Sequence, residues 1–192
     1  MGVRDEKKRE TRARLERAAL DLFARGRYDG TTVEEVAAKA GVSARTAFRY
    51  FPAKADLVFG DAESDLRALR GALAAQDRSL PAFEATRMAL AEFSERIDKP
   101  ITAERSRVVA TNPTLMARLL GERERWVDAV AAELAARGGA GRPDERDRLG
   151  GYLVVAILAT AVREWSRADG NAQSLREVVD RSASWAVEIL QP

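Results

Sequence analysis

The stretch Thr31–Leu57, which reads TTVEEVAAKAGVSARTAFRYFPAKADL, constrains the fold of this 192-residue chain more than any other segment. Thr32 and Glu35 have the spacing of a capping box, in which each side chain satisfies a backbone N–H of the other residue, so we expect a helix to begin near Val33. Gly41 stands where this helix should end, because glycine adopts the positive φ of such an end without strain. The pattern predicts a short helix followed by a tight turn.

A second short helix follows the turn. Ser43 is a suitable N-cap for it, and the helix would cover residues 44–50. We expect Phe48 and Phe51 to turn inward at this spacing. The side chains expected to stay exposed are Ala44, Arg45, Thr46, Arg49 and Tyr50. An exposed helix of this composition suits the major groove of DNA better than it suits solvent.

Two interpretations of this helix pair are open. The first is a helix-turn-helix unit that reads DNA, with Arg45 on a guanine edge and Tyr50 on a phosphate. Lys54 would lie at the start of the next helix, where we expect a phosphate to be its only nearby partner. The second is an ordinary helical hairpin whose arginines face water, because helix-turn-helix geometry has no strict sequence pattern. Under the first interpretation the candidate DNA-contacting residues are Thr32, Ser43, Ala44, Arg45, Thr46, Arg49, Tyr50 and Lys54.

Positive charge is concentrated in the part of the chain that holds this helix pair. Residues 1–60 contain 13 Lys and Arg against 9 Asp and Glu, whereas residues 61–192 contain 19 against 21. A DNA partner would require the basic excess on the helix-turn-helix side, so the distribution favours the first interpretation.

The segment GVSARTAFRYFPAKADL, residues 41–57, resembles the tetracycline-repressor (TetR/AcrR) family of bacterial transcription regulators. The residues that match the family pattern in register are Gly41, Val42, Ser43, Thr46, Phe51, Lys54 and Leu57. Three positions depart from it, with Ala47 in place of Leu, Phe48 in place of Tyr and Tyr50 in place of His. Phe48 has no hydroxyl for the phosphate contact that the resemblance implies, whereas Tyr50 can supply one from a nearby position.

The rest of the chain also favours helices. Hydrophobic residues make up 46% and charged residues 32% of the sequence, which is typical of a globular protein. Ala, Leu, Arg and Glu dominate, and proline is rare. We expect an all-α fold of about nine helices, with a three-helix DNA-binding domain over residues 1–55 and a helical ligand-binding and dimerisation domain over residues 56–192. A mobile arm of residues 1–8 would precede the first helix.

The last two predicted helices, about residues 144–168 and 174–190, have more apolar surface than one subunit can cover. The first of them is apolar nearly all round over residues 152–162, so it must be covered on more than one side. We therefore expect a homodimer that reads a palindromic operator, and the family resemblance implies that these helices form a four-helix bundle with their symmetry mates. The expected interface residues are Leu153, Ile157, Val178, Ser182, Trp185 and Ile189.

The resemblance also implies a small-molecule pocket in the C-terminal domain and a repressor that leaves its operator when the ligand binds. Because the inward faces carry few charges, we expect a mostly apolar ligand. The stretch TNPTLMARLLGERERWVDAV, residues 111–130, looks like a subgroup associated with fatty-acyl or acyl-CoA sensing. For each candidate side chain, ordinary core packing is the alternative role. The candidate ligand-binding residues are Phe83, Leu90, Phe93, Leu119, Trp126 and Trp165.

Several function classes conflict with the composition. The chain has no cysteine and no histidine, so we expect no thiolate or imidazole metal site, no Ser-His or Cys-His catalytic pair and no cofactor. An all-helical enzyme and a ligand-independent architectural DNA binder stay open as alternatives to the regulator. An apolar run of about 20 residues and an N-terminal apolar leader are both missing, so we expect a cytoplasmic protein without a membrane partner.

Overall fold

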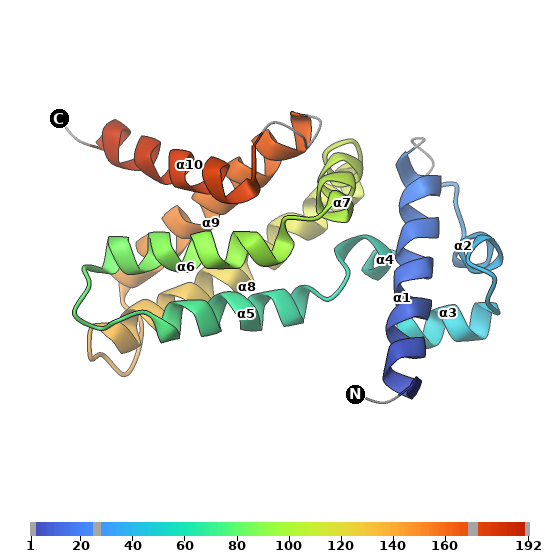
Figure 1. Cartoon of the computed structure of the whole chain (residues 1–192), viewed down its shortest axis with the longest axis horizontal. Helices are drawn as coiled ribbons and strands as arrows, with labels where there is room; N and C mark the ends of the chain where they lie inside the picture. The colour runs from blue at the N-terminus through green and yellow to red at the C-terminus, as the bar shows by residue number, and fades with distance from the viewer. Residues whose placement is uncertain (1–2, 25–27, 169–172, 191–192) are drawn as a thin grey trace. The chain divides into compact units, whose positions relative to one another are not determined.

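All regular secondary structure in the computed structural model, which describes residues 3–24, 28–168 and 173–190, is helical (Figure 1). The predicted all-α fold is therefore confirmed. The helices are α1 (Val3–Leu22), α2 (Val33–Lys39), α3 (Ala44–Tyr50), α4 (Asp56–Phe59), α5 (Ala62–Ala75), α6 (Ala82–Ile97), α7 (Pro100–Ala110), α8 (Pro113–Arg137), α9 (Glu145–Arg167) and α10 (Leu175–Leu190). Among the described residues, no helix is long and apolar enough to cross a membrane.

The chain forms two compact units. The N-terminal unit comprises Met1–Ala62 together with Glu104–Met116, and the C-terminal unit comprises Glu63–Ala103 together with Ala117–Pro192. The grouping of residues 104–116 with the N-terminal helices was not predicted from the sequence. The predicted division of function after residue 55 remains a prediction.

Apolar side chains at helical spacing close the core of the N-terminal unit. Leu15 and Ala19 of α1 and Phe23, just after its end, form a buried stripe, and Phe51 and Leu57 are fully buried in the same unit. This helix begins at Val3, so the predicted mobile arm over residues 1–8 is wrong for the described residues. Acidic residues in its first turn favour helix at that end, because they complement the positive end of the helix dipole.

The two short helices begin as the sequence predicts. The Thr32 hydroxyl accepts a hydrogen bond from the Glu35 backbone N–H at 3.1 Å, and the Glu35 carboxylate accepts one from the Thr32 N–H at 2.7 Å. Gly41 has a φ of 68°, and Ser43 caps α3. The predicted capping box, turn and N-cap are therefore confirmed, and each is formed by residues no more than five apart.

The next helix, which we expected to start at about Lys54, is divided into α4 and α5 at Gly60. This glycine has a φ of 63°, a conformation that other residues adopt only with strain. The Arg105 guanidinium also lies 2.6 Å from the position that a Cβ at residue 60 would occupy. The backbone conformation therefore favours glycine at the division, whereas the flexible Arg105 side chain could move aside for a Cβ.

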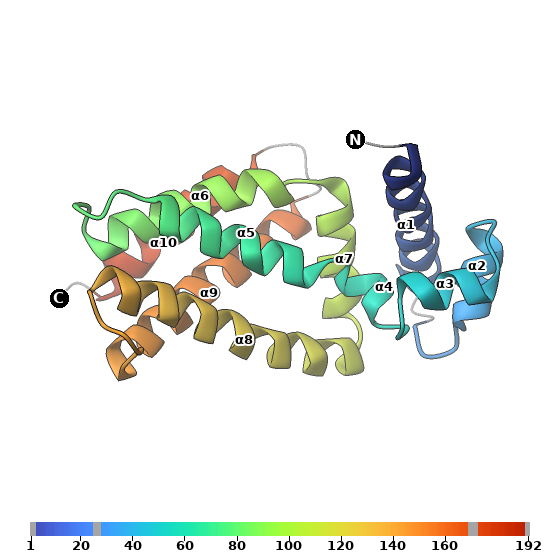
Figure 2. The same cartoon turned by 90° about the horizontal axis from the view of Figure 1, so that it is seen from below.

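In the C-terminal unit, α10 packs across α9 and α6, and α5 and α8 contribute to the same core (Figures 1 and 2). The core takes side chains from each of these helices, among them Leu69, Leu73, Leu90, Phe93, Val130, Leu158, Ala161, Trp165, Val178 and Val179. The last two predicted helices correspond to α9 and α10, and α9 begins at a capping box formed by Asp144 and Asp147.

Candidate nucleic-acid interface and ligand cavity

The exposed side of α3 is short, basic and held at its N-terminus. The Ser43 hydroxyl accepts the Thr46 backbone N–H at 3.2 Å and donates to the Thr46 hydroxyl at 3.0 Å. Arg45 and Arg49 are exposed one turn apart on the side opposite the buried Ala47. A helix of seven residues with its first turn capped can therefore present two guanidinium groups from a fixed backbone.

The prediction that Phe48 turns inward is wrong. Its side chain is 43% exposed, whereas Ala47 and Phe51 are fully buried. The two buried residues are four apart and therefore share one helix face, which turns the Phe48 ring about 100° away from that face. The prediction failed because Ala47 and Phe48 are adjacent, and the larger side chain was assigned to the core. Phe48 thus joins Arg45 on the exposed surface.

The two residues at the end of α3 contact each other. The Arg49 guanidinium carbon lies 5.5 Å from the centre of the Tyr50 ring, and Tyr50 is half-buried. This cation–π contact restricts the rotamers of an otherwise exposed arginine. A hydroxyl and a guanidinium are therefore available together at the C-terminal end of the helix.

The expectation that a phosphate is the only nearby partner of Lys54 is wrong. Its ammonium group donates hydrogen bonds to the backbone carbonyls of Tyr28 at 2.7 Å, Thr31 at 3.1 Å and Asp29 at 3.3 Å. It also lies 4.4 Å from the centre of the Tyr28 ring. An ammonium has three donors, and all three are used within the protein. Lys54 therefore fastens the loop before α2 to the segment after α3.

A buried carboxylate in the N-terminal unit joins α1 to α7. One oxygen of Glu16 accepts from Arg105 Nη2 at 2.9 Å, and the other accepts from Arg12 Nε at 3.2 Å. The Arg12 guanidinium in turn lies 4.6 Å from the centre of the Phe51 ring. Asn112, just after α7, donates to the Asp29 carboxylate at 3.2 Å. These contacts were missed from the sequence because their partners are up to 89 residues apart and share no pattern.

The C-terminal unit contains a largely apolar cavity of about 390 Å³ between α6, α8, α9 and α10. Its lining residues are Ala82, Phe83, Thr86, Arg87, Leu90, Leu134, Gly150, Leu153, Val154, Ile157, Ala183, Ala186 and Val187. This volume lies within the range of small-molecule sites. The predicted ligand residues Phe83 and Leu90 are brought together here.

The other four predicted ligand residues do not line this cavity. Phe93 and Trp165 are buried in the core, and the Phe93 ring meets Trp126 edge to face with centroids 5.7 Å apart. Leu119 is half-buried on α8. Their placement agrees with the packing alternative that the sequence left open, since buried aromatic pairs of this geometry stabilise a core.

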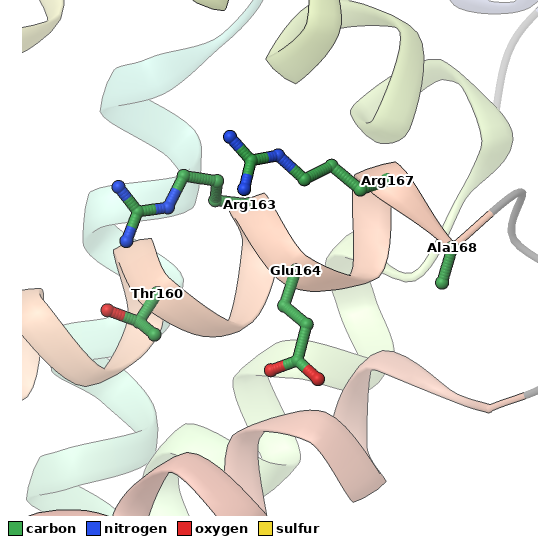
Figure 3. A pocket seen from close by; sticks show the side chains of 5 residues that line it. All are labelled: Thr160, Arg163, Glu164, Arg167 and Ala168. Carbon is green, nitrogen blue, oxygen red and sulfur yellow. The ribbon is translucent and has the colours of Figure 1, made fainter.

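A second, shallow hollow lies along the C-terminal half of α9. Figure 3 shows Arg163 and Arg167 side by side, with Glu164 turned toward α10. Glu164 accepts a hydrogen bond from Arg181 at 2.7 Å, so its carboxylate is already paired. Burial and the neighbouring Arg163 lower the pKa of Arg123. All residues lining the hollow come from α9 and its C-cap Ala168, which leaves the hollow without opposing walls and makes it a poor ligand site.

Half of the predicted dimer contacts are unavailable to a partner. Ile157, Val178 and Ser182 are buried within the protomer, because α10 packs on α9 and α6 through this face. The prediction for these three residues is wrong. The other three are exposed, namely Leu153, Trp185 and Ile189. Two neighbours on α9, Leu149 and Tyr152, extend this exposed apolar set and were missed because the burial of α9 could not be assigned to individual faces.

Two parts of this chain match known protein families. Residues 16–59 match bacterial regulatory proteins of the tetR family, and residues 80–190 match the MftR C-terminal domain. The HTH-type transcriptional regulator TcmR of Streptomyces glaucescens is 32% identical over 184 residues, which cover 91% of this chain and 81% of TcmR. A protein named as the mycofactocin biosynthesis transcriptional regulator MftR, from Mycobacterium tuberculosis, is 28% identical over 152 residues, 78% of this chain and 76% of that protein.

Solved structures agree on the fold. FadR of Thermus thermophilus, a TetR-family transcriptional repressor in complex with lauroyl-CoA, has a TM-score of 0.58 at 21% identity and covers 94% of this chain and 95% of its own. A TetR-family regulator of Mesorhizobium loti has a TM-score of 0.58 at 19% identity, with 93% and 96% covered. On the two sequence matches and the identity to TcmR, the chain belongs to the TetR family of transcriptional regulators.

Proposed function

We propose that this TetR-family regulator is a repressor that binds a palindromic operator as a homodimer and leaves it when a small, mostly apolar molecule enters the C-terminal unit. The observation that carries the proposal is the exposed face of α3, where two arginines and an aromatic ring project from a capped helix of seven residues. Such a surface has no role in the core, and its size and charge suit a major groove.

The residues of α3 would divide into base-reading and backbone-binding groups. Arg45 projects from the first turn, where recognition helices approach base edges, and its planar fork suits the two acceptors of guanine. Arg49 and Tyr50, held together at the other end, would bind phosphates. The predicted contacts from Thr32, Ser43, Ala44 and Thr46 remain in the proposal as backbone or edge contacts. Lys54 is withdrawn as a phosphate ligand because its donors are used.

A homodimer would form through the exposed apolar side chains of α9 and α10. Leu153, Trp185 and Ile189, with Leu149 and Tyr152, place large apolar surface in solvent, and a second copy is the partner that would cover it. A two-fold dimer carries two copies of α3 and therefore matches two half-sites of a palindrome.

Effector binding would shift the protein toward a state that no longer fits both half-sites. The support is the apolar cavity and the likeness to FadR of T. thermophilus, which was solved with lauroyl-CoA. A ligand can shift this equilibrium only by binding one state better than the other. The relatives are regulators, so we propose no catalytic activity, and a DNA-bound regulator would work in the cytoplasm, where bacterial DNA lies.

Selection of DNA from a random library by the purified full chain tests the proposal. Wild type should enrich a palindrome, and Arg45→Ala should bind it more weakly by about 1–3 kcal/mol and lose preference at one base position in each half-site. Arg142→Ala, which removes an exposed arginine from the loop before α9, is the matched control and should bind like wild type. Failure to enrich any sequence, or an unchanged preference in Arg45→Ala, would contradict the proposal.

A further inference from the structure

We propose that the cavity between α6, α8, α9 and α10 binds an uncharged, mostly hydrocarbon molecule and disfavours carboxylates and coenzyme A esters. The inference rests on the proposed effector function and narrows it to one cavity and one ligand class. It replaces the fatty-acyl or acyl-CoA ligand that residues 111–130 led us to expect. It follows from what lines the cavity, from the charges at its edge and from its volume.

The cavity walls offer almost no hydrogen-bonding groups to a ligand. Of the lining side chains, only Thr86 and Arg87 are polar. The Thr86 hydroxyl donates to the backbone carbonyl of Ala82 at 2.8 Å, one turn earlier in α6, so its proton is already used. A ligand with several polar groups would lose its bonds to water on entry without replacing them. The lining therefore favours a ligand that consists mostly of hydrocarbon.

Arg87 is the one charged group in the lining, and two carboxylates already pair with it. Arg87 bonds the Glu84 carboxylate through Nε and Nη2, both at 3.1 Å, and the Asp180 carboxylate through Nη1 at 2.9 Å. The hydrogen bonds that both carboxylates accept raise the pKa of Arg87. Two carboxylates around one guanidinium leave a net negative charge at this edge. An anionic head group would have to displace an existing partner of Arg87 and then face the remaining carboxylate.

The size of the cavity limits the length of the ligand. Its volume is about 390 Å³, and since a water-sized group occupies about 30 Å³, roughly a dozen such groups fit. A chain of ten carbons with one hydroxyl meets this limit. A coenzyme A ester of the same chain would leave its phosphates outside the cavity, beside the acidic edge.

Direct binding of three matched ten-carbon probes tests the proposal, with 1-decanol, sodium decanoate and decanoyl-CoA titrated into the full-length protein. Wild type should bind decanol at least tenfold more tightly than either anion. Ala186→Phe, which places a ring in the cavity from α10, should abolish decanol binding. Ala136→Phe, the same change on an exposed position of α8, is the control and should bind decanol like wild type. Should Ala186→Phe fail to fold, Ala82→Phe at the first residue of α6 fills the cavity from its edge.

The double variant Glu84→Gln, Asp180→Asn tests the charge argument separately. It frees Arg87, so decanoate should gain about tenfold in affinity while decanol binding stays unchanged. Equal or tighter binding of decanoate or decanoyl-CoA by wild type would overturn the inference, as would decanol binding that survives both cavity-filling variants. Because these readouts do not involve DNA, they stand apart from operator binding. One outcome separates the two proposals, namely that decanol binds as expected but does not release the protein from the operator that wild type selects. In that case the cavity assignment holds and the effector role in the proposed function fails.

Discussion

The two candidate sites of this protein are held in place by different kinds of interaction. The surface of α3 depends on hydrogen bonds at fixed points, from the Ser43 cap at its start to the Lys54 ammonium bound to three carbonyls beyond its end. The cavity in the C-terminal unit depends on the packing of four helices and has almost no polar contacts in its walls. A substitution at the first site acts by removing a directional bond, whereas one at the second acts by changing volume or introducing charge.

In the C-terminal unit we therefore expect a charge in the buried core to destabilise the protomer. A charge on an exposed apolar face should leave the fold of the protomer intact. The distinction can be tested within α10, where the exposed side chains that we assign to the dimer interface are close in sequence to buried ones.

The largest effect is expected from a charge placed in the core beside α10. Val178 is 2% exposed, so Val178→Asp should destabilise the protomer by about 3 kcal/mol or more, because a buried carboxylate would have no partner. For a chain of this length that corresponds to a fall in melting temperature of about 6 °C or more. Thermal unfolding followed by circular dichroism measures it.

The same charge on the exposed face is the matched variant. Ile189 is 80% exposed, so Ile189→Asp should leave the unfolding of the protomer within about 0.5 kcal/mol of wild type. It should convert dimers to monomers in sedimentation and weaken operator binding. Monomeric wild type, or dimeric Ile189→Asp with unchanged sedimentation, would show that the interface lies elsewhere.

The second prediction concerns Lys54. Lys54→Met keeps most of the side-chain stem and removes the ammonium, leaving three carbonyls without their donor, so we expect a loss of about 1–3 kcal/mol in stability. Operator binding should weaken through this loss of order, and the slope of log affinity against log salt should stay as in wild type. Arg49→Met, which removes a proposed phosphate contact, should instead make that slope shallower by about one unit per half-site. A shallower slope in Lys54→Met would restore the phosphate contact expected from the sequence.

The sequence predicted the N-terminal unit well wherever structure is local. The capping box of Thr32 and Glu35, the turn at Gly41 and the cap at Ser43 each involve residues within six positions, so their spacing contains the necessary information. Local spacing does not contain the partners of Lys54, which lie 23–26 residues away. The expectation for this residue therefore failed although its position in the motif was correct.

In the C-terminal unit, the sequence was enough to predict where the helices lie along the chain. It was not enough to predict which face of each helix is buried. The apolar residues of α9 cover most of its circumference, so periodicity could not tell which of them face the core, the cavity or a partner. Ile157 and Val178 were assigned to the dimer interface and are buried in the protomer instead. Which face is buried depends on how α10 lies across α9 and α6, and that is a tertiary property.

The third prediction concerns the one aromatic ring that α3 exposes. Phe48 lies on the same surface as Arg45, and an apolar ring there suits the methyl group of a thymine. Burying one methyl group contributes about 0.8 kcal/mol, so replacing the contacted thymine of a selected operator by deoxyuridine should weaken wild-type binding about fourfold. Phe48→Ala should bind the two DNAs equally. A variant that keeps the full preference for thymine would remove Phe48 from the reading surface.

The smallest effect is expected at the start of α10, where the C-terminal unit has a local cap like those of the N-terminal unit. The Glu177 carboxylate accepts hydrogen bonds from the Ser174 backbone N–H at 2.8 Å and from its hydroxyl at 3.0 Å, and these bonds lower the pKa of Glu177 from its ordinary value of 4.5. A lowered pKa in the folded state means that the charged carboxylate stabilises the fold above pH 4.5 and that this contribution is lost as pH falls through the folded-state pKa. Glu177→Gln keeps an acceptor and loses the charge, so its melting temperature should be slightly below that of wild type at pH 7, and the gap should close in acid. Glu188→Gln, an exposed position of the same helix, is the control and should show no gap. A gap at Glu177 that is independent of pH would mean that side-chain shape, and not charge, determines the contribution of this cap.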